Sequence, residues 1–535
     1  MDSEPKTNTS SRLEWVGAIL ITVAIVALHI HFYLHVGGLW RDEINTVNLA
    51  RSHSLVTMSH DSFPVLMPAL VSVWDAIGFG TTDHGLRLIG LLCGLGLPAA
   101  FWAVAWASRR PPLFSLTLFG LNTLMICYGD SLRAYGPGSA LITLALAAMW
   151  ALLAKPSWQR VAWLALAGIL SVQALFQNAI LFFAIALGGF SVCARRKDGP
   201  TALKILTAGI ITASSLLPYY ANFMVMPKAA VELRRGFSPF IAELNYEMAA
   251  GFPFEQYQAV WKGLAVIVVG LAAFSLFRKR ATVEESDGSL RLFSGVTLVA
   301  TVVLFIGFLW YASVMSRPWY FMPLLALVAV CFDCGMRWKA GLLKTVGLAC
   351  VFGTALMGAL MAYSDLHAHF SDIDLVVERL KPRVAPGDYV VVTPWFTGIT
   401  FDHYYQKQSD WDTLPPITDH TMHRYDLVLE QMERTNALNP VLAKIEATLQ
   451  RGNRVWVVGS LPDWHTNDPV PKPLPPPPLP GSGWSDTAYN GSWAAQTGDF
   501  LNRHSAELKV YSAFGDGAPN MQENAALYTA QGWRD

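Results

Sequence analysis

Long apolar runs alternate with short polar segments along the chain up to about residue 362. About 20 apolar residues are needed to cross the roughly 30 Å hydrocarbon core of a bilayer, and by that rule the pattern predicts about eleven transmembrane helices. The predicted spans are residues 15–36, 85–107, 112–128, 135–154, 160–177, 178–193, 203–223, 258–277, 292–313, 318–335 and 341–362. The pattern therefore predicts a polytopic α-helical membrane protein.

The short loops between these spans alternate in charge. Every second loop is basic, and the basic residues are Arg109, Arg110, Lys155, Arg160, Arg195, Arg196, Lys197, Arg278, Lys279, Arg280, Arg337 and Lys339. The other short loops hold only Arg133 and Arg317. Because cytoplasmic loops carry an excess of Lys and Arg, we expect a cytoplasmic N-terminus, an uncleaved first span and a C-terminal region in the periplasm or outside the cell.

Two long loops fall on the expected outer side. In the first, residues 37–84, the apolar residues Ile44, Val47 and Ala50 recur at helical spacing, and the segment PVLMPALVSVWDAIGF is too short and too polar to span. We expect both segments to be juxtamembrane helices that lie on the membrane surface. The loop at 224–257 has a similar pattern, and together these helices would cover a cavity at the outer leaflet.

The composition changes to that of a soluble domain from about residue 365. Helices are predicted at 372–383 and 439–451, and buried strands at 387–394 and 453–460. The proline-rich segment 469–483 predicts a stiff polyproline-type loop. The expected domains are therefore a transmembrane domain, residues 1–364, and an extracytoplasmic α/β domain, residues 365–535. Its residues His403, Tyr404, Tyr405 and His465 form no recognisable catalytic pattern, so acceptor binding is its expected use.

Composition agrees with burial in lipid. The chain is 53% hydrophobic and only 15% charged, whereas soluble domains carry about 25% charged residues. Lys and Arg (39) balance Asp and Glu (39), which gives no reason to expect a nucleic-acid partner. All six cysteines lie within or beside apolar runs, so no disulfide framework is expected. Cys331 and Cys334 are expected to be neighbouring core thiols. We find no glycine loop that would bind a soluble nucleotide.

Polar and aromatic residues gather at the expected outer ends of the spans. The stretch LWRDEINTV follows the first span and contains Asp42 and Glu43. The other stretches are YGDSLRAYG with Asp130, Arg133 and Tyr135, the span junction with Gln177 and Asn178, and SRPWYFMP with Arg317, Trp319 and Tyr320. Since charges close to a membrane are costly unless they pair or function, we expect these groups to meet at one membrane depth.

The order and sidedness of these motifs resemble the GT-C family of polyprenyl-phosphate-sugar glycosyltransferases. The resemblance is to the branch with protein O-mannosyltransferases, lipid A aminoarabinose transferases and rhizobial galacturonic acid transferases, and it covers about residues 15–335 and the C-terminal tail. Asp130 is one residue farther from Arg133 than in the commoner E-x-R-x-Y spacing. The family's H-P-P is represented by the segment from His60 to Pro64, and Gln177 or Asn178 replaces the histidine of the fifth-span region.

The resemblance implies that Asp42 is the catalytic aspartate, that Glu43 is its acidic neighbour and that Asp130 is the second acidic residue. The chemistry asks for the same residue types. A carboxylate must accept the proton of an acceptor hydroxyl that attacks the anomeric carbon opposite the phosphate, so the anomeric centre is inverted. Guanidinium groups bind phosphate oxygens in bidentate fashion, and we assign that role to Arg317 and Arg133. Candidate residues for binding the sugar or the lipid chain are Trp40, Trp319, Tyr320, Tyr135, His60 and Asn178.

Structural roles compete with the catalytic assignment of the first loop. Asp is favoured at helix N-caps, so Asp42 could be only the cap of a helix that begins near Glu43. Arg41 could neutralise either carboxylate, and that pairing is compatible with catalysis.

Structural roles compete with the other assignments as well. Asp130 and Arg133 could form a surface salt bridge that contributes less than about 1 kcal/mol. Arg317 and Trp319 could be interfacial anchors of the aromatic belt, and His60 could be a solvated loop residue.

The sequence therefore predicts a membrane glycosyltransferase that takes a sugar from a polyprenyl-phosphate donor and transfers it to an envelope glycolipid, polysaccharide or protein. The resemblance allows a divalent metal ion as a cofactor, but the sequence shows no closed ligand set, and no metal ligand is assigned. The alternatives are a transporter or flippase for a lipid-linked glycan and a non-catalytic envelope scaffold.

Overall fold

The chain forms two compact units. The helical unit contains the N-terminal segment up to Leu34, Leu55–Asn222 and Arg235–His367, and the α/β unit contains His35–Ser54 and Ala368–Asp535. The structure, a computed structural model, describes residues 9–59, 61–221, 237–250, 257–277, 285–312, 316–336, 341–406, 408–462, 470–477, 485–512 and 520–535.

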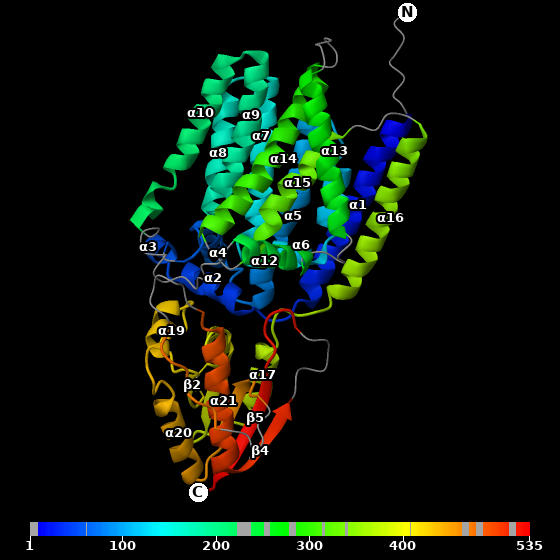
Figure 1. Cartoon of the computed structure of the whole chain (residues 1–535). Helices are drawn as coiled ribbons and strands as arrows, with labels where there is room; N and C mark the ends of the chain where they lie inside the picture. Colours follow the sequence, from blue (N-terminus) through cyan, green and yellow to red (C-terminus); the bar gives the residue numbers. More distant parts are fainter. Residues whose placement is uncertain are drawn as a thin grey trace, which may run out of the picture. The chain divides into compact units, whose positions relative to one another are not determined.

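Most of the helical unit consists of long helices (Figure 1). They are α1 (Thr9–His35), α5 (Asp83–Ser108), α7 (Tyr135–Ala154), α8 (Trp158–Ala174), α9 (Asn178–Arg196), α10 (Gly199–Ser214), α13 (Tyr257–Phe277), α14 (Glu285–Ala312), α15 (Met322–Gly335) and α16 (Leu342–Asp365). The short helices are α3 (Leu55–Met58), α4 (Leu66–Ala76), the π-helix η1 (Ser115–Gly120), α6 (Thr123–Gly129), the 3₁₀-helix η2 (Leu217–Tyr219), α12 (Phe237–Ala250) and the 3₁₀-helix η3 (Pro318–Phe321).

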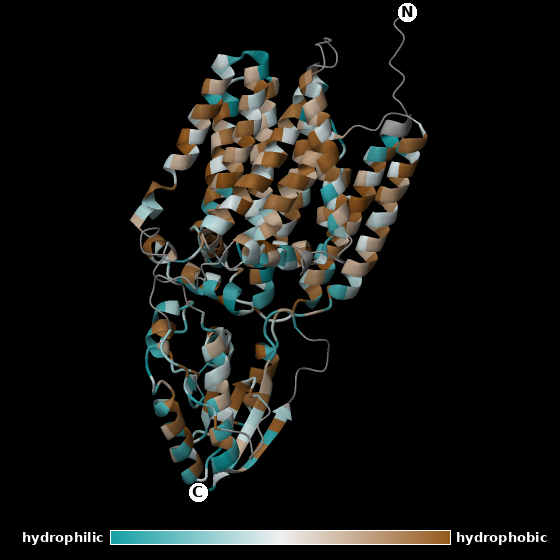
Figure 2. Ribbon diagram, viewed as in Figure 1, coloured by the Kyte–Doolittle hydropathy of each residue, from teal (hydrophilic) through white to brown (hydrophobic). Residues whose placement is uncertain are grey.

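Nine helices of the described chain are long and apolar enough to cross a membrane, and the colour of hydrophobic residues predominates along the helices of the helical unit in Figure 2. The predicted fold class, a polytopic helical membrane protein, is confirmed. The predicted span 112–128 differs: it is divided into η1 and α6, because the Asn122 side chain accepts hydrogen bonds from the backbone of Leu124 and Met125 and starts a new helix. The predicted span 160–177 is the 17-residue helix α8.

The helical unit is layered around α7 and α15. Helix α15 is buried along its whole length and packs against α7, α14 and η1. Helices α10, α13 and α16 bury far fewer of their residues, so they form the periphery. In Figure 1, α16 runs beside α1, and Lys344 of α16 forms an ion pair with Glu14 of α1.

The α/β unit is built on one five-stranded sheet with the strand order β2-β1-β3-β5-β4. Strands β2, β1 and β3 are parallel, whereas β5 is antiparallel to both β3 and β4. The elements of this unit are α2 (Arg41–Arg51), α17 (Ile373–Leu380), β1 (Tyr389–Thr393), α18 (Thr397–Tyr405), β2 (Asp410–Thr413), α19 (Tyr425–Met432), α20 (Asn439–Gln450), β3 (Val455–Gly459), α21 (Thr487–His504), β4 (Ser505–Ser512) and β5 (Ala526–Trp533).

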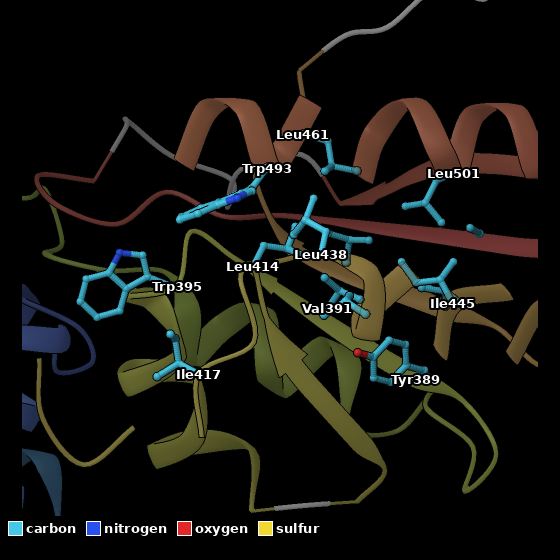
Figure 3. Packing of buried hydrophobic residues seen from close by; sticks show 14 of the residues in the cluster. Tyr389, Val391, Trp395, Leu414, Ile417, Leu438, Ile445, Leu461, Trp493 and Leu501 are labelled. Carbon is cyan, nitrogen blue, oxygen red and sulfur yellow. The ribbon is translucent and has the colours of Figure 1, made fainter. Parts of the chain in front are cut away.

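Alternate residues of the central strands face opposite sides of this sheet, as the period of two in a strand requires. Val391 and Val457 pack with Ile445 of α20 and Leu501 of α21, as Figure 3 shows for Val391, Ile445 and Leu501. The intervening residues of β1 and β3 pack against α17 and α18. The unit is therefore a three-layer α/β/α sandwich, and its predicted helices and strands are present.

Two expectations about the outer segments can be compared with the structure. Helix α2 exists, belongs to the α/β unit and packs against α18, and its place on the membrane surface stays a prediction. Its apolar residues Ile44, Val47 and Ala50 are buried. The described part of the proline-rich segment, residues 470–477, forms neither helix nor strand. All six cysteines are free.

Candidate functional site

Helix α2 begins directly after the first hydrophobic helix, and a carboxylate other than Asp42 caps it. Trp40 is the N-cap residue, and its backbone N–H donates to Glu43 Oε2 at 3.4 Å. The expectation that Asp42 caps this helix is therefore wrong, since Asp42 is its second residue. Glu43 is fully buried, and a carboxylate in the first turn stabilises the positive end of a helix. Its position supports a structural role.

Asp42 lies in the first turn of α2 with two basic groups beside it. Its Oδ1 is 3.8 Å from Nε of Arg41 and 3.5 Å from Nε2 of His423. The Asp42 side chain is 19% exposed, and that of His423 is 16% exposed. Asp42 is thus a partly buried carboxylate that keeps contact with solvent, as a proton acceptor requires.

His423 belongs to the segment between β2 and α19 and is the functional candidate that the sequence pattern missed. Its backbone N–H donates to Asn45 Oδ1 at 3.1 Å. Its ring stacks on Tyr425, with ring centroids 5.8 Å apart, and lies edge-on to Trp395 at 6.3 Å. More than 370 residues separate it from Asp42, so no local spacing could associate the two.

Arg41 anchors the start of α2 within the α/β unit. Its Nη1 donates to Glu523 Oε1 at 3.3 Å, and its guanidinium lies 4.4 Å from the ring centroid of Phe396. Glu523 also accepts hydrogen bonds from Thr400 Oγ1 at 3.0 and 3.2 Å. Burial raises the pKa of Glu523, and the positive charge of Arg41 opposes that rise. Arg41 therefore pairs more closely with Glu523 than with Asp42.

The remaining polar and aromatic candidates of the α/β unit have packing roles. Trp40 is 1% exposed and stacks on Phe370 at 5.6 Å, so protein encloses its ring. The Tyr404 hydroxyl accepts a hydrogen bond from the backbone of Leu39 at 2.7 Å. Tyr405 is in the core, and its hydroxyl contacts Ser409 Oγ at 2.8 Å. His465 lies outside the described residues.

In the helical unit, Arg133 lies in the turn before α7 and faces the loop at 61–65. Its Nη1 is 3.7 Å from Asp61 Oδ2, and its guanidinium lies 4.2 Å from the ring centroid of Phe63. The Tyr219 hydroxyl accepts a hydrogen bond from the backbone of Val65 at 3.2 Å and holds that loop. The surface salt bridge expected between Arg133 and Asp130 is therefore wrong.

Asp130 instead turns into the helical unit and pairs with the first hydrophobic helix. Its Oδ1 is 2.6 Å from Nδ1 of His29, and the residue is 4% exposed. A Cβ atom at Gly94 of α5 would lie 1.7 Å from that same Oδ1, so only glycine allows this approach. Burial raises the pKa of Asp130 to about 6, and His29 opposes the rise. The predicted catalytic carboxylate is thus in a buried pair that fixes the turn carrying Arg133.

Phe63, the ring that contacts Arg133, is part of a larger group of aromatic contacts. Tyr128 stacks on Trp319 with ring centroids 4.4 Å apart. Tyr135 lies edge-on to Phe63 at 5.5 Å and 6.1 Å from Tyr320. The predicted site residues Tyr135, Trp319 and Tyr320 thus belong to one group of ring contacts, and this group reaches the Arg133 guanidinium through Phe63.

The last predicted residues of the helical unit differ in what they can do. Asn178 is fully buried, and its Nδ2 donates to Gly138 O at 2.9 Å and to Ser171 O at 3.2 Å, so it joins three helices. Its neighbour Gln177 donates to Tyr320 O at 3.0 Å. Arg317 is exposed before η3. His60 lies outside the described residues.

The described residues do not fit a divalent metal site. Within the residues that the structure describes, no group of three or more His, Cys, Asp or Glu side chains could hold a metal ion. Asp42 and His423 are two potential ligands, but the guanidinium of Arg41 is 3.8 Å from the same carboxylate oxygen. A second cation at that oxygen would meet like charge.

Comparison with known proteins shows structural similarity at low sequence identity. No protein-family model and no curated protein matches the chain. The chain is similar over 95% of its length to 97% of ArnT from Cupriavidus metallidurans bound to undecaprenyl phosphate, with a TM-score of 0.46 and 11% identity. It is similar over 82% of its length to 67% of the Archaeoglobus fulgidus oligosaccharyltransferase, with a TM-score of 0.42 and 11% identity.

A third similarity is to the arabinofuranosyltransferase AftD from Mycobacteria. It covers 96% of this chain and 40% of that chain, with a TM-score of 0.42 and 15% identity. Because each TM-score is below 0.5, these similarities carry no argument about the function of this chain.

Proposed function

We propose that the chain is a GT-C-type glycosyltransferase that moves a sugar from a polyprenyl-phosphate donor to a cell-envelope acceptor on the outer side of a bacterial inner membrane. The observation that carries the proposal is the carboxylate of Asp42. It follows the first hydrophobic helix directly, and Arg41 and His423 approach one of its oxygens while the residue stays 19% exposed. A residue with only a capping role would not need this arrangement, since Glu43 caps the helix.

In the proposed reaction, Asp42 accepts the proton of the acceptor hydroxyl. The hydroxyl oxygen forms a bond to the anomeric carbon as the bond from that carbon to the phosphate oxygen breaks, and the electron pair of the broken bond stays on the phosphate. Attack and departure occur on opposite faces, so the anomeric configuration is inverted. A positioned base contributes about 10²- to 10⁴-fold to such a step.

We assign the donor phosphate to Arg133 and Arg317. Arg133 is supported by its contact with the ring of Phe63, which itself contacts Tyr135, because a guanidinium beside aromatic rings can bind a phosphate and leave ring faces for an isoprenoid chain. Arg317 is supported by its exposed position directly before η3. The expected electrostatic result is stabilisation of the departing phosphate.

Asp42→Asn is the decisive test. Membranes that contain the wild-type or variant chain are incubated with envelope fractions and with labelled lipid-linked sugars extracted from the producing cells. The labelled product is then separated, and its mass is measured by mass spectrometry. The variant is expected to lose at least about 100-fold in transfer and to keep its affinity for undecaprenyl phosphate. Glu433→Gln removes an exposed carboxylate after α19 and is the matched control, with unchanged transfer.

The same experiment separates the rival functions. A transporter or flippase would move lipid-linked sugar across the vesicle membrane with the wild-type chain and with Asp42→Asn alike. A scaffold would yield no labelled product with either chain. Full transfer by Asp42→Asn would refute the proposed base. Arg133→Met is expected to weaken binding of undecaprenyl phosphate about tenfold, while Arg133→Lys keeps part of it because the charge remains.

A further inference from the structure

We infer that His423 is a positioning residue that holds Asp42 in place and makes sugar transfer dependent on pH. This inference rests on the proposed function, since it assigns a second residue to the same base. The α/β unit would then supply part of the catalytic arrangement itself, beyond the acceptor binding that its sequence predicts.

A polar stripe on α2 faces the segment that carries His423. Asp42, Asn45 and Asn48 are spaced three residues apart, so they lie along one side of the helix. Asp42 is 3.5 Å from the His423 ring, Asn45 accepts from the His423 backbone at 3.1 Å, and Asn48 donates to Thr421 O at 3.0 Å. Three successive contacts therefore fix this segment along α2.

The contacts on Asp42 restrain the orientation of its carboxylate. His423 Nε2 and Arg41 Nε both approach Oδ1, at 3.5 and 3.8 Å. Two groups on one oxygen limit rotation of the carboxylate, and a base must be held in the geometry of the transfer to be efficient. The His423 ring is itself held between Tyr425 and Trp395.

Of the two basic groups shown beside the Asp42 carboxylate, His423 is the one whose charge can change near neutral pH, because a guanidinium stays charged. Arg41 stays charged and is closer to Glu523 than to Asp42. The next residue, Arg424, pairs with Asp426 at 2.7 Å and with Asp419 at 2.5 Å. Tyr425, which stacks on the ring, is a phenol that ordinarily titrates near pH 10. A histidine ordinarily titrates at about 6.5.

The sign of the pH effect follows from this charge. A protonated imidazole 3.5 Å from Asp42 favours the carboxylate and reduces its tendency to take a proton. We therefore expect the maximal rate of transfer to fall about tenfold on the acid side of the His423 titration, with little change in the KM for the donor.

Three histidine variants test the inference in the full-length chain with the transfer assay between pH 5 and 8. His423→Ala is expected to lose at least tenfold in maximal rate at pH 7.5. His423→Gln can still donate a hydrogen bond but cannot titrate, so it is expected to restore most of that rate and to abolish the fall at acid pH. His420→Gln changes a histidine three residues earlier that stacks on Trp411, and it is the control that retains the wild-type profile.

A purely structural role for His423 would lower the rate without altering the pH profile. The inference is overturned if His423→Gln keeps the acid-side fall, or if His423→Ala stays within twofold of wild type. It is supported if the alanine variant melts normally while the glutamine variant loses only the pH dependence. Failure of the proposed function has a different signature, because the wild-type chain would then yield no labelled product, and full transfer by Asp42→Asn would refute the base itself.

Discussion

The buried pair of Arg41 and Glu523 should decide whether the start of α2 stays attached to the α/β unit. The Glu523 side chain is 2% exposed and that of Arg41 is 19% exposed, with 3.3 Å between the charged atoms. Removing one partner of a buried ion pair costs about 3–5 kcal/mol because the other charge stays buried. Since Arg41 keeps some solvent contact, we expect the lower end, about 3 kcal/mol, for Glu523→Gln.

This free energy can be converted into a melting temperature. For a unit of about 200 residues, each kcal/mol lowers Tm by about 2–4 °C, so the transition of the α/β unit should shift by roughly 6–12 °C. Scanning fluorimetry of the full chain in detergent measures this shift. The double variant Arg41→Met with Glu523→Gln should lose less than either single variant, because no buried charge is left without its partner and Met can pack beside Phe396.

The pH dependence of stability gives a second test of the Arg41–Glu523 pair. Burial raises the pKa of Glu523 in the folded chain, so the folded state holds this proton more tightly than the unfolded state. The contribution of Glu523 to stability is therefore present at low pH and is lost as pH rises through the raised pKa. Arg41→Met should enlarge this loss. Additive losses in the double variant, or single losses below about 1 kcal/mol, would refute a coupled buried pair.

Three other predictions concern the helical unit and the surface of the α/β unit. Gly94→Ala places a Cβ 1.7 Å from Asp130 Oδ1, so it should lower both Tm and donor binding. The control is Gly96→Ala, whose new Cβ would lie 3.8 Å from its nearest neighbour and should change neither quantity. Equal effects of the two variants would contradict the packing argument. Asn178→Ala removes the donor to two helix carbonyls and should destabilise the helical unit by about 1–3 kcal/mol. A Tm shift measures this loss, whereas weaker lipid binding at an unchanged Tm would indicate a ligand contact instead. Asp419 and Asp426 have lowered pKa values: Asp426 chiefly accepts hydrogen bonds from Arg424, whereas Asp419 accepts them from Thr421 and then from Arg424, and burial opposes both shifts. The stability that these aspartates add is present above their ordinary pKa and is lost as pH falls through the lowered values. Arg424→Met should reduce the slope of the Tm profile between about pH 5 and pH 3, and an unchanged slope would exclude Arg424 as a source of it.

Hydrophobic periodicity predicted most of the fold because it is a local property. Runs such as residues 135–154 and 318–335 are long enough to cross a bilayer whatever they pack against, and both are helical in the structure. The strands at 389–393 and 455–459 were likewise visible as short apolar runs after turn residues. The division of 112–128 was missed because a side-chain cap by Asn122 outweighs the continuous hydropathy.

The candidate site was only partly predictable for the same physical reason. The sequence alone placed a carboxylate after the first span and an arginine among aromatic residues, since residue type and position relative to apolar runs can be read along the chain. It did not determine that Glu43 caps α2, that Asp130 pairs with His29, or that His423 lies beside Asp42. Those pairings depend on which side chains the packing of distant segments brings within about 4 Å, where Coulomb and hydrogen-bond energies become large. Only the tertiary structure decides that.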